Sequence, residues 1–313
     1  MNDWPPTAAI DNLRSRAELV ARIRHFFDQR GVIEVSTPCM TASGVTDVNI
    51  DSIELSHGGF LRTSPEYWHK RLLAAGFGDL YELGPVFRAG EAGRFHQPEF
   101  TLLEWYRVGW SWQRLADEVV TLIQHCLHDD QGMRPIHQRS WNECFQDNLG
   151  IDALSASRSE LEKLAIDAPP GCSHDMLLDY LFATRIQPVF EENGITIIHD
   201  YPATQAALAR LNPDNPAVAE RFEVFVGSLE LANGYGELCD AGEQLERFRA
   251  DNQKRKALGR RPMPIDSNFI DALQQGLPQC AGVALGVDRL IMAALNAADM
   301  TEVISFPPPP PTR

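Results

Sequence analysis

The stretch that most constrains this chain is Tyr81–Arg107, YELGPVFRAGEAGRFHQPEFTLLEWYR. It predicts two strands, Tyr81–Phe87 and Glu99–Tyr106, joined by a charged loop. Alternate residues of a strand share a face. One face of the second strand therefore carries Phe100, Leu102, Glu104 and Tyr106. A buried carboxylate needs a partner, so Glu104 indicates either a cationic ligand or, on an edge strand, a solvated side chain.

The loop between these strands contains three hydrogen-bond donors, Arg88, Arg94 and His96. Arginine presents a planar fork of N–H groups that matches phosphate oxygens, and histidine adds a further donor. The loop is therefore suited to bind an anion such as phosphate.

A second candidate site lies in the runs Arg221–Val226 and Leu229–Ala232, which bracket a two-residue turn. In that hairpin we expect Phe225 to oppose Glu230 and Glu223 to oppose Ala232, which places both glutamates on one face. Two close carboxylates repel each other unless a cation lies between them. The pattern predicts a divalent-metal site, with a solvated face as the alternative.

A third candidate is the segment Gly282–Met292, GVALGVDRLIM. It predicts a strand of small residues followed by a helix that Asp288 caps and that runs through Leu295. Arg289 then lies in the first helical turn, and a helix N-terminus with an arginine is a phosphate site. The sequence contains no GxxxxGK[ST] loop, so phosphate would be bound in this other way.

The rest of the chain predicts short strands and scattered helices. A helix is expected over Leu13–Arg30, a strand over Val32–Val35, and a second helix that Ser64 caps, with Pro65 and Glu66 in its first turn, and that ends at Gly76. From about 111 to 194 we expect a helical insertion, before a strand at Ile195–His199. The fold class is α+β, an antiparallel sheet flanked by helices within one domain of 313 residues.

Composition narrows the function classes. The formal charge of −15 disfavours nucleic acid as a partner, although residues 245–262 carry seven Lys/Arg against two acids, a net of +5. Six cysteines without a CxxC pair favour a reducing, cytoplasmic location, and no segment predicts a membrane span. His125 and His128 lie one turn apart but lack a third metal ligand.

Three segments resemble the motifs of class II aminoacyl-tRNA synthetases of the lysyl type. FRAGEAGRFHQPEFTLLEWY resembles motif 2, GVALGVDRLIM resembles motif 3, and Glu230–Leu238, ELANGYGEL, resembles the lysine-pocket segment between them. The N-terminal helix and strand resemble motif 1, which implies a homodimer. We expect no anticodon-binding domain. The chain most resembles the truncated lysyl-tRNA synthetase paralogues that attach (R)-β-lysine to elongation factor P.

This resemblance implies adenylate chemistry with ATP and Mg²⁺, and it assigns roles to individual residues. It places Arg88 on the α-phosphate, Arg289 on the γ-phosphate, and Mg²⁺ on Glu223 and Glu230. The nucleotide would be held by the backbone of Ala89 and Gly90 and by Gln97, Phe100, Leu231 and Gly286. The amino acid, lysine or β-lysine, would be bound by Ser64, Pro65, Glu66, Glu104, Tyr106, Asn233 and Glu237. Arg88, Glu237 and Arg289 would be the catalytic residues.

Two positions depart from the lysyl pattern. Arg88-Ala89-Gly90 stands where Arg-Asn-Glu is usual, so either Glu91 substitutes or the adenine contacts are made by backbone. Ala284 stands where lysyl-tRNA synthetases have glycine, which suits a substrate whose amino group sits elsewhere. Two alternatives remain open: a minimal enzyme that charges RNA, with tRNA the less expected acceptor, and a non-catalytic sensor. A proline-rich tail is expected at 307–313.

Overall fold

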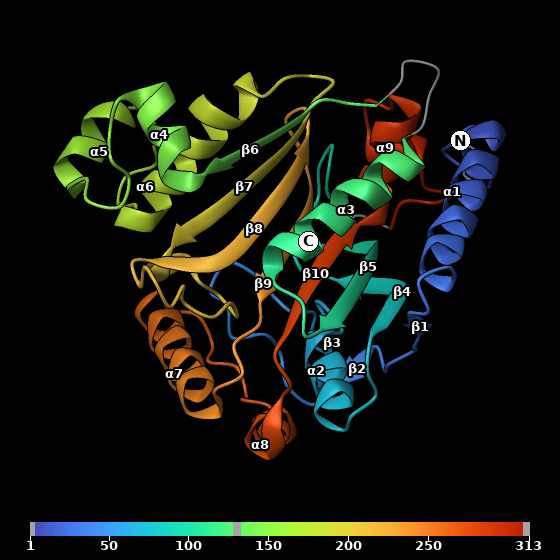
Figure 1. Cartoon of the computed structure of the whole chain (residues 1–313), viewed down its shortest axis with the longest axis horizontal. Helices are drawn as coiled ribbons and strands as arrows, with labels where there is room; N and C mark the ends of the chain where they lie inside the picture. The colour runs from blue at the N-terminus through green and yellow to red at the C-terminus, as the bar shows by residue number, and fades with distance from the viewer. Residues whose placement is uncertain (1–3, 128–132, 309–313) are drawn as a thin grey trace.

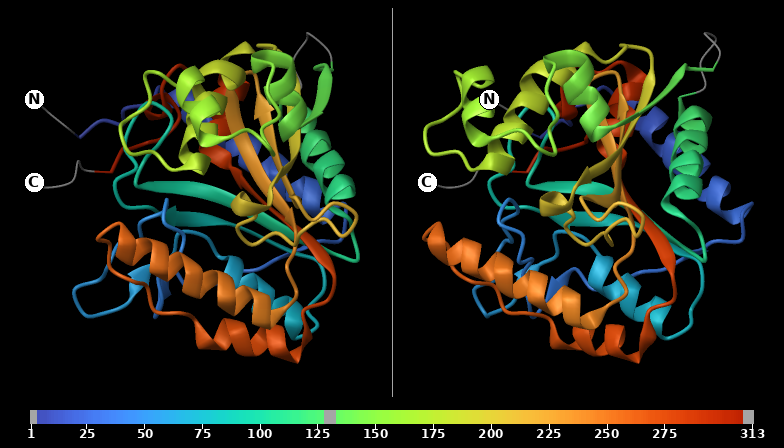
Figure 2. Two further views of the ribbon diagram at one scale, coloured as in Figure 1. Left: turned by 90° about the vertical axis from the view of Figure 1, so that its left-hand side faces the viewer. Right: turned by 60° about the vertical axis from the view of Figure 1, so that its left-hand side comes forward.

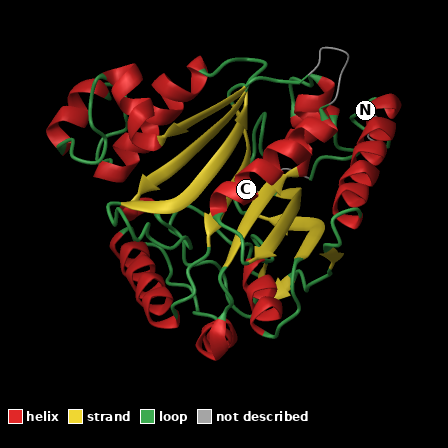
Figure 3. Cartoon of the chain, in the orientation of Figure 1, coloured by secondary structure: helices red, strands yellow, loops and turns green. Residues whose placement is uncertain are grey.

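The computed structural model describes residues 4–127 and 133–308. A mixed eight-stranded sheet runs through the molecule in the order β1-β4-β5-β10-β9-β8-β7-β6 (Figures 1 and 3). Neighbouring strands are antiparallel except at the two edges, where β1 pairs with β4 and β6 with β7 in parallel. The sheet strands are β1 Ile33–Glu34, β4 Leu80–Phe87, β5 Glu99–Val108, β6 Ile136–Ser140, β7 Ile195–Pro202, β8 Val218–Val226, β9 Leu229–Gly236 and β10 Cys280–Gly286.

Helices cover both faces and the lower end of the sheet in Figure 1. They are α1 Ile10–Asp28, α2 Glu66–Ala74, α3 Trp112–Cys126, α4 Trp141–Leu149, α5 Arg158–Leu164, α6 His174–Leu181, α7 Ala241–Ala257, α8 Ser267–Gly276 and α9 Val287–Leu295. A small separate sheet pairs β2 Met40–Thr41 with β3 Phe60–Leu61. The α+β architecture of a sheet flanked by helices is confirmed, with two parallel edge pairs that the sequence pattern did not indicate.

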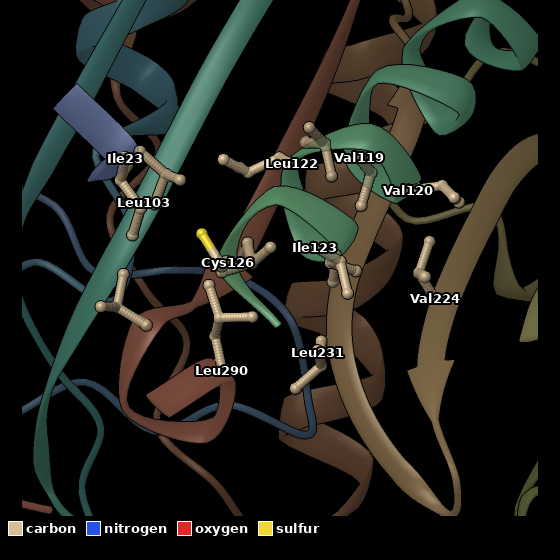
Figure 4. Close-up of a cluster of buried hydrophobic side chains, with 14 of the residues drawn as sticks. Ile23, Leu103, Val119, Val120, Leu122, Ile123, Cys126, Val224, Leu231 and Leu290 are labelled. Atoms are coloured by element: carbon tan, nitrogen blue, oxygen red, sulfur yellow. The ribbon is translucent and has the colours of Figure 1, made fainter. Parts of the chain in front are cut away.

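The main core lies between one face of the sheet and the helices α1, α3 and α9. Leu103 and Trp105, which point to the opposite side of β5 from Glu104, are both fully buried in it. Figure 4 shows Ile23 of α1, Ile123 of α3 and Leu290 of α9 converging there. Burying one such side chain contributes about 1.5–3 kcal/mol. With this face closed by apolar packing, the other face of β5, β9 and β10 is left for the polar residues.

The range predicted as a helical insertion divides into two parts. Helix α3 belongs to the main core, whereas α4, α5 and α6 pack with Tyr201 and Phe225 around a second apolar cluster. Figure 2 shows these three helices grouped at one end of the sheet. Strand β6 was not predicted; it is mostly exposed and offers little alternation from which a strand could be recognised.

Three local expectations need correction or lie outside the described residues. Asp288 does not cap α9: Gly286 is the N-cap, and the Asp288 carboxylate instead pairs with Arg16 and accepts from the Thr101 N–H. His128 and residues 309–313 of the tail lie outside the described residues. Among the residues that are described, no group of three or more His, Cys, Asp or Glu could hold a metal, and no helix could span a membrane.

Candidate active site

A cavity opens against the polar face of β5, β9 and β10, beside α2, α7 and the start of α9. Most of the predicted site residues line it together: Ser64, Glu66, Arg88, Gln97, Phe100, Glu104, Tyr106, Glu230, Leu231, Asn233, Glu237, Ala284, Gly286 and Arg289. Four others do not line it: Pro65, Ala89, Gly90 and Glu223. Residues more than two hundred positions apart are thus brought to one cavity by the pairing of β10 with both β5 and β9.

One end of the cavity is rich in carboxylates. Glu104 is 3% exposed, so the interpretation as a solvated edge residue is wrong. Its oxygens accept hydrogen bonds from Ser64 Oγ at 2.8 Å and from the Tyr106 hydroxyl at 2.9 Å. Ser64 Oγ also accepts from the Glu66 N–H at 3.0 Å, which fixes the start of α2 beside the cavity. Glu104 is therefore held rigidly with its charge at the cavity wall.

The sequence prediction missed Lys70, the cation at the centre of this end. Its side chain is fully buried, and Nζ lies 2.6 Å from both Glu66 Oε1 and Glu237 Oε2. The two carboxylates raise the pKa of Lys70 against the effect of burial. Burial and the neighbouring Glu66 raise the pKa of Glu237 to about 8, although Lys70 acts in the opposite direction. A helical Lys-Arg pair is ordinarily a surface feature; the one available signal was the Glu66–Lys70 spacing of four.

The other end of the cavity is cationic. Arg289 donates from Nη1 to the Glu230 carbonyl at 3.0 Å and from Nε to the Phe95 carbonyl at 3.2 Å. Its Nη2 lies 2.6 Å from His96 Nε2. Burial and the charge of Arg289 lower the pKa of His96, so the imidazole is neutral and accepts from the guanidinium. Arg289 is thereby fixed at the N-terminal turn of α9, where the helix dipole favours an anion.

The remaining donors of the charged loop differ in placement. Arg88 lines the cavity, 5.1 Å from the centre of the Phe100 ring, and its Nη1 lies 3.5 Å from Glu91. Arg94 does not line the cavity and binds the Ala298 carbonyl. The expectation that all three loop donors face one anion therefore fails for Arg94.

Motif 2 could contact the adenine either through the Glu91 side chain or through backbone, and the structure favours Glu91. The N–H of Ala89 donates to the Asp51 carbonyl at 2.8 Å, so this group is already used. Gly90 has a φ of +79°, a conformation that strains residues with a side chain, and it does not line the cavity. Glu91 lines the cavity beside Arg88. Glu91 is therefore better placed than the Ala89 N–H to contact a nucleotide.

The β8–β9 hairpin confirms one predicted pair and corrects the other. Phe225 opposes Glu230 as expected, but a bulge between Val224 and Phe225 places Glu223 opposite Asn233 rather than Ala232. Arg221 Nη2 and Asn233 Nδ2 both contact Glu223 Oε1, at 2.6 and 3.2 Å. Burial and the charge of Glu230 raise the pKa of Glu223. Two carboxylates are too few for a Mg²⁺ site of protein ligands alone, yet Mg²⁺ is commonly bound by one or two carboxylates with substrate phosphates.

Close packing against neighbouring side chains explains the glycines of this region. A Cβ at Gly234 would lie 2.4 Å from the Phe222 ring, and one at Gly282 would lie 2.3 Å from both Tyr106 and Glu237. Ala284 is the pairing partner of Glu104 on one side and Asn233 on the other. Its methyl group therefore lies between the strands that carry the polar residues.

The basic run of α7 is largely structural. Arg255 is buried and donates to the Asp47 carbonyl at 2.8 Å and to Asp51 at 3.2 Å, while Arg261 pairs with Glu54 at 2.7 Å. These contacts bind α7 to the segment 47–54, part of which lines the cavity. Of the basic residues of α7, only Arg249, Lys254 and Lys256 are exposed and form a solvated helix face.

Fold and cavity together define the catalytic domain of a class II synthetase. The family described as tRNA synthetases class II (D, K and N) matches residues 4–309, and the chain belongs to it. It is a ligase of this family, and it therefore uses ATP.

Individual proteins are similar to this chain over 97–98% of its length. The elongation factor P–(R)-β-lysine ligase of Vibrio vulnificus is 45% identical to this chain, and the match covers 98% of each protein. The enzymes of the same name from Photorhabdus laumondii and Klebsiella pneumoniae are each 46% identical, over 97% of both chains.

Proposed function

We propose that this protein activates (R)-β-lysine, or lysine, with ATP and transfers it to a lysine side chain of elongation factor P. The observation that carries the proposal is the cavity with two opposite ends. The buried carboxylates Glu104 and Glu237, with the partly buried Glu66, suit the ammonium groups of a diamino acid, while Arg88 and Arg289 suit phosphates. The names of the full-length relatives supply the isomer and the acceptor.

The first step forms an aminoacyl-adenylate. The carboxylate of the amino acid attacks the α-phosphorus of ATP, the bond to the β-phosphate oxygen breaks, and pyrophosphate leaves. Arg88 neutralises charge that develops on the α-phosphate, and Arg289 holds the γ-phosphate at the N-terminus of α9. Glu104, Tyr106 and Glu237 bind the side-chain ammonium, with Glu66, Ser64 and Asn233 on the remaining groups.

The nucleotide is held between these ends. Gln97, Phe100 and Glu91 contact the adenine, and Leu231 and Gly286 pack against it. Glu230 with Glu223 would hold Mg²⁺ once phosphate oxygens complete its ligands, and the ion would offset charge on the departing pyrophosphate.

The second step forms the amide. A lysine amine of the acceptor attacks the acyl carbon, and AMP leaves. Because an ordinary lysine has a pKa near 10.4, only about one amine in a thousand is neutral at pH 7. The incoming amine must therefore be deprotonated or desolvated, and the cavity carboxylates or the adenylate phosphate are the candidate acceptors of its proton.

The direct test incubates the pure protein with ATP and each lysine isomer, and then adds either elongation factor P or tRNA. We expect amino-acid-dependent exchange of pyrophosphate with ATP and transfer to the protein acceptor. Transfer to tRNA alone would favour the RNA-charging alternative. Nucleotide binding without exchange would favour a sensor.

We further propose a cytoplasmic enzyme, with its six cysteines unpaired, and a homodimer whose molar mass in solution is measured by light scattering.

Ala284→Gly is expected to shift the choice of isomer toward α-lysine. Removing a methyl group between Glu104 and Asn233 opens space where an α-amino group would lie. One methyl group in a tight pocket is worth about 1–3 kcal/mol of discrimination. The ratio of kcat/KM for α-lysine to that for β-lysine should therefore rise by at least about tenfold. An unchanged ratio in a stable variant would place isomer selection elsewhere.

Reversing the exposed charges of α7 is expected to slow acceptor transfer without affecting adenylate formation. Arg249, Lys254 and Lys256 are exposed on the helix whose other side lines the cavity. If they attract an acidic face of the acceptor, changing all three to glutamate should reduce the transfer rate most at low salt. The matched control reverses Arg158 and Lys163, which are exposed on α5, and Arg185, which is exposed in the helical turn after α6. Equal rates in both triple variants would contradict docking at α7.

A further inference from the structure

His69 lies behind the cavity, between the carboxylates of two neighbouring strands. Its side chain is fully buried on α2. Nε2 lies 3.0 Å from Glu82 Oε2, and Nδ1 lies 3.3 Å from Glu104 Oε1 as an ion pair. The imidazole also packs against the Tyr106 ring in a T-shaped arrangement, with 5.5 Å between ring centres. His69 was not a predicted site residue, and the chemistry proposed above does not use it.

The two carboxylates would conflict without a cation between them. Glu82 and Glu104 are direct partners in the β4–β5 ladder, and they are 4% and 3% exposed. Like charges that face each other across a sheet are destabilising, and burial strengthens the repulsion. A neutral imidazole brings no charge between the two carboxylates, whereas an imidazolium lies within ion-pair distance of both, with a hydrogen bond to Glu82 through Nε2 and a purely electrostatic contact from Nδ1 to Glu104. This placement between two carboxylates favours the charged form.

The pKa of His69 supports this assignment. Glu104 and Glu82 raise it, against the effect of burial. The other charged groups nearby are already engaged: Arg62 Nη1 contacts Glu82 at 2.8 Å, and Lys70 is held by Glu66 and Glu237.

The two carboxylates depend on His69 to different extents. Glu82 has a second cation in Arg62, and it also accepts from the Thr37 hydroxyl at 2.7 Å. Its pKa is lowered to about 2, with His69 the largest lowering influence. Within the described residues, His69 is the one cation that pairs with Glu104, whose other partners are the neutral hydroxyls of Ser64 and Tyr106. Loss of His69 therefore affects Glu104 most.

We propose that His69 is a positioning residue of the amino-acid pocket, an imidazolium that separates Glu82 from Glu104 and keeps Glu104 ionised where it meets the substrate ammonium. The inference rests on the proposed function, because it assigns Glu104 to the amino acid. In this proposal Thr37, Glu82 and His69 form a layer of contacts behind the ammonium site. The layer determines the charge of Glu104, which the substrate meets.

Removing His69 should leave Glu82 and Glu104 sharing a proton, since two close carboxylates do not both ionise easily. A protonated Glu104 attracts an ammonium group poorly. The defect should disappear if the charge of Glu82 is removed as well, because Glu104 then has no repelling neighbour. This reversal separates a charge role from a simple loss of packing.

The test compares His69→Met, Glu82→Gln and the double variant by pyrophosphate exchange. At pH 7 we expect His69→Met to raise the KM for the amino acid at least tenfold, with kcat at saturation and the KM for ATP within twofold of the wild type. Raising the pH should lower that KM, because the shared proton leaves, while the wild type changes little. The double variant should return to within threefold of the wild type. His69→Gln, which keeps a hydrogen bond but no charge, repeats the test if the methionine variant is poorly folded.

Two results would overturn the inference: an unchanged KM in both His69 variants, or a double variant no better than His69→Met at equal thermal stability. Failure of the proposed function looks different, because the wild type itself would then show no exchange with either isomer. In that case thermal unfolding still decides, since His69→Met should lower Tm and the added Glu82→Gln should recover it. A double variant with an additive loss of Tm would reject the charge-separating role.

Discussion

Arg289→Ala is expected to abolish most amino-acid-dependent pyrophosphate exchange while leaving the fold intact. The guanidinium is held by two backbone carbonyls and by neutral His96, so it meets a phosphate without reorganising. Removing one such preorganised contact to developing charge costs about 100- to 1,000-fold in kcat. Glu237→Ala should be comparably inactive, because the substrate ammonium loses a buried carboxylate. Both variants are measured by exchange at saturating ATP and amino acid.

Arg94→Ala is the matched control for Arg289→Ala. Arg94 belongs to the charged loop and, like Arg289, donates to a backbone carbonyl, that of Ala298, but it does not line the cavity. Its removal tests whether loss of an arginine anchoring this loop is itself enough to impair exchange. We expect Arg94→Ala to retain exchange within about threefold. Near-normal exchange in a well-folded Arg289→Ala variant would remove Arg289 from the site.

The parts of the fold that the sequence predicted well are those with strong local patterns. The alternation of Glu99–Tyr106 indicated a strand that carries Glu104 on an otherwise mainly apolar face, and β5 spans Glu99–Val108 with that face on the cavity. The small residues of Gly282–Gly286 indicated a close-packed strand, and β10 lies between β5 and β9. Local patterns fail where pairing is irregular, since one bulge changed the partner of Glu223.

The charge-compensating layer of the site was not predictable in the same way. His69 and Lys70 are adjacent on α2, and in the sequence they look like the polar side of a surface helix. Their burial depends on Glu82, Glu104 and Glu237, which lie on three different segments. Only the sheet register brings these groups together, so no short-range pattern reports it. The carboxylates that line the cavity were recognisable, whereas the cations that make their burial tolerable were not.

Lys70→Met is expected to destabilise the protein by about 3–5 kcal/mol, the usual cost of removing one partner of a buried ion pair. Lys70 contacts Glu66 and Glu237 at 2.6 Å each, and its loss leaves both carboxylates without this cation. Lys70→Met/Glu237→Gln should lose less than Lys70→Met, because only one ionisable carboxylate then remains at the bridge. The free energy of unfolding is measured by urea denaturation.

The effect of Lys70→Met should also depend on pH, with a sign that follows from Glu237. Its pKa in the folded wild type is already raised to about 8, above the ordinary value of 4.5. A carboxyl group with a raised folded-state pKa binds more protons in the folded than in the unfolded protein between those two values, so stability falls as pH rises through that window. Without Lys70 the pKa values of Glu66 and Glu237 rise further. The stability difference between wild type and Lys70→Met should therefore be larger at pH 8 than at pH 5. An equal stability difference at both pH values would show that Lys70 acts through packing rather than through its charge. The charges of Glu66 and Glu237 would then have to be compensated by other groups of the pocket.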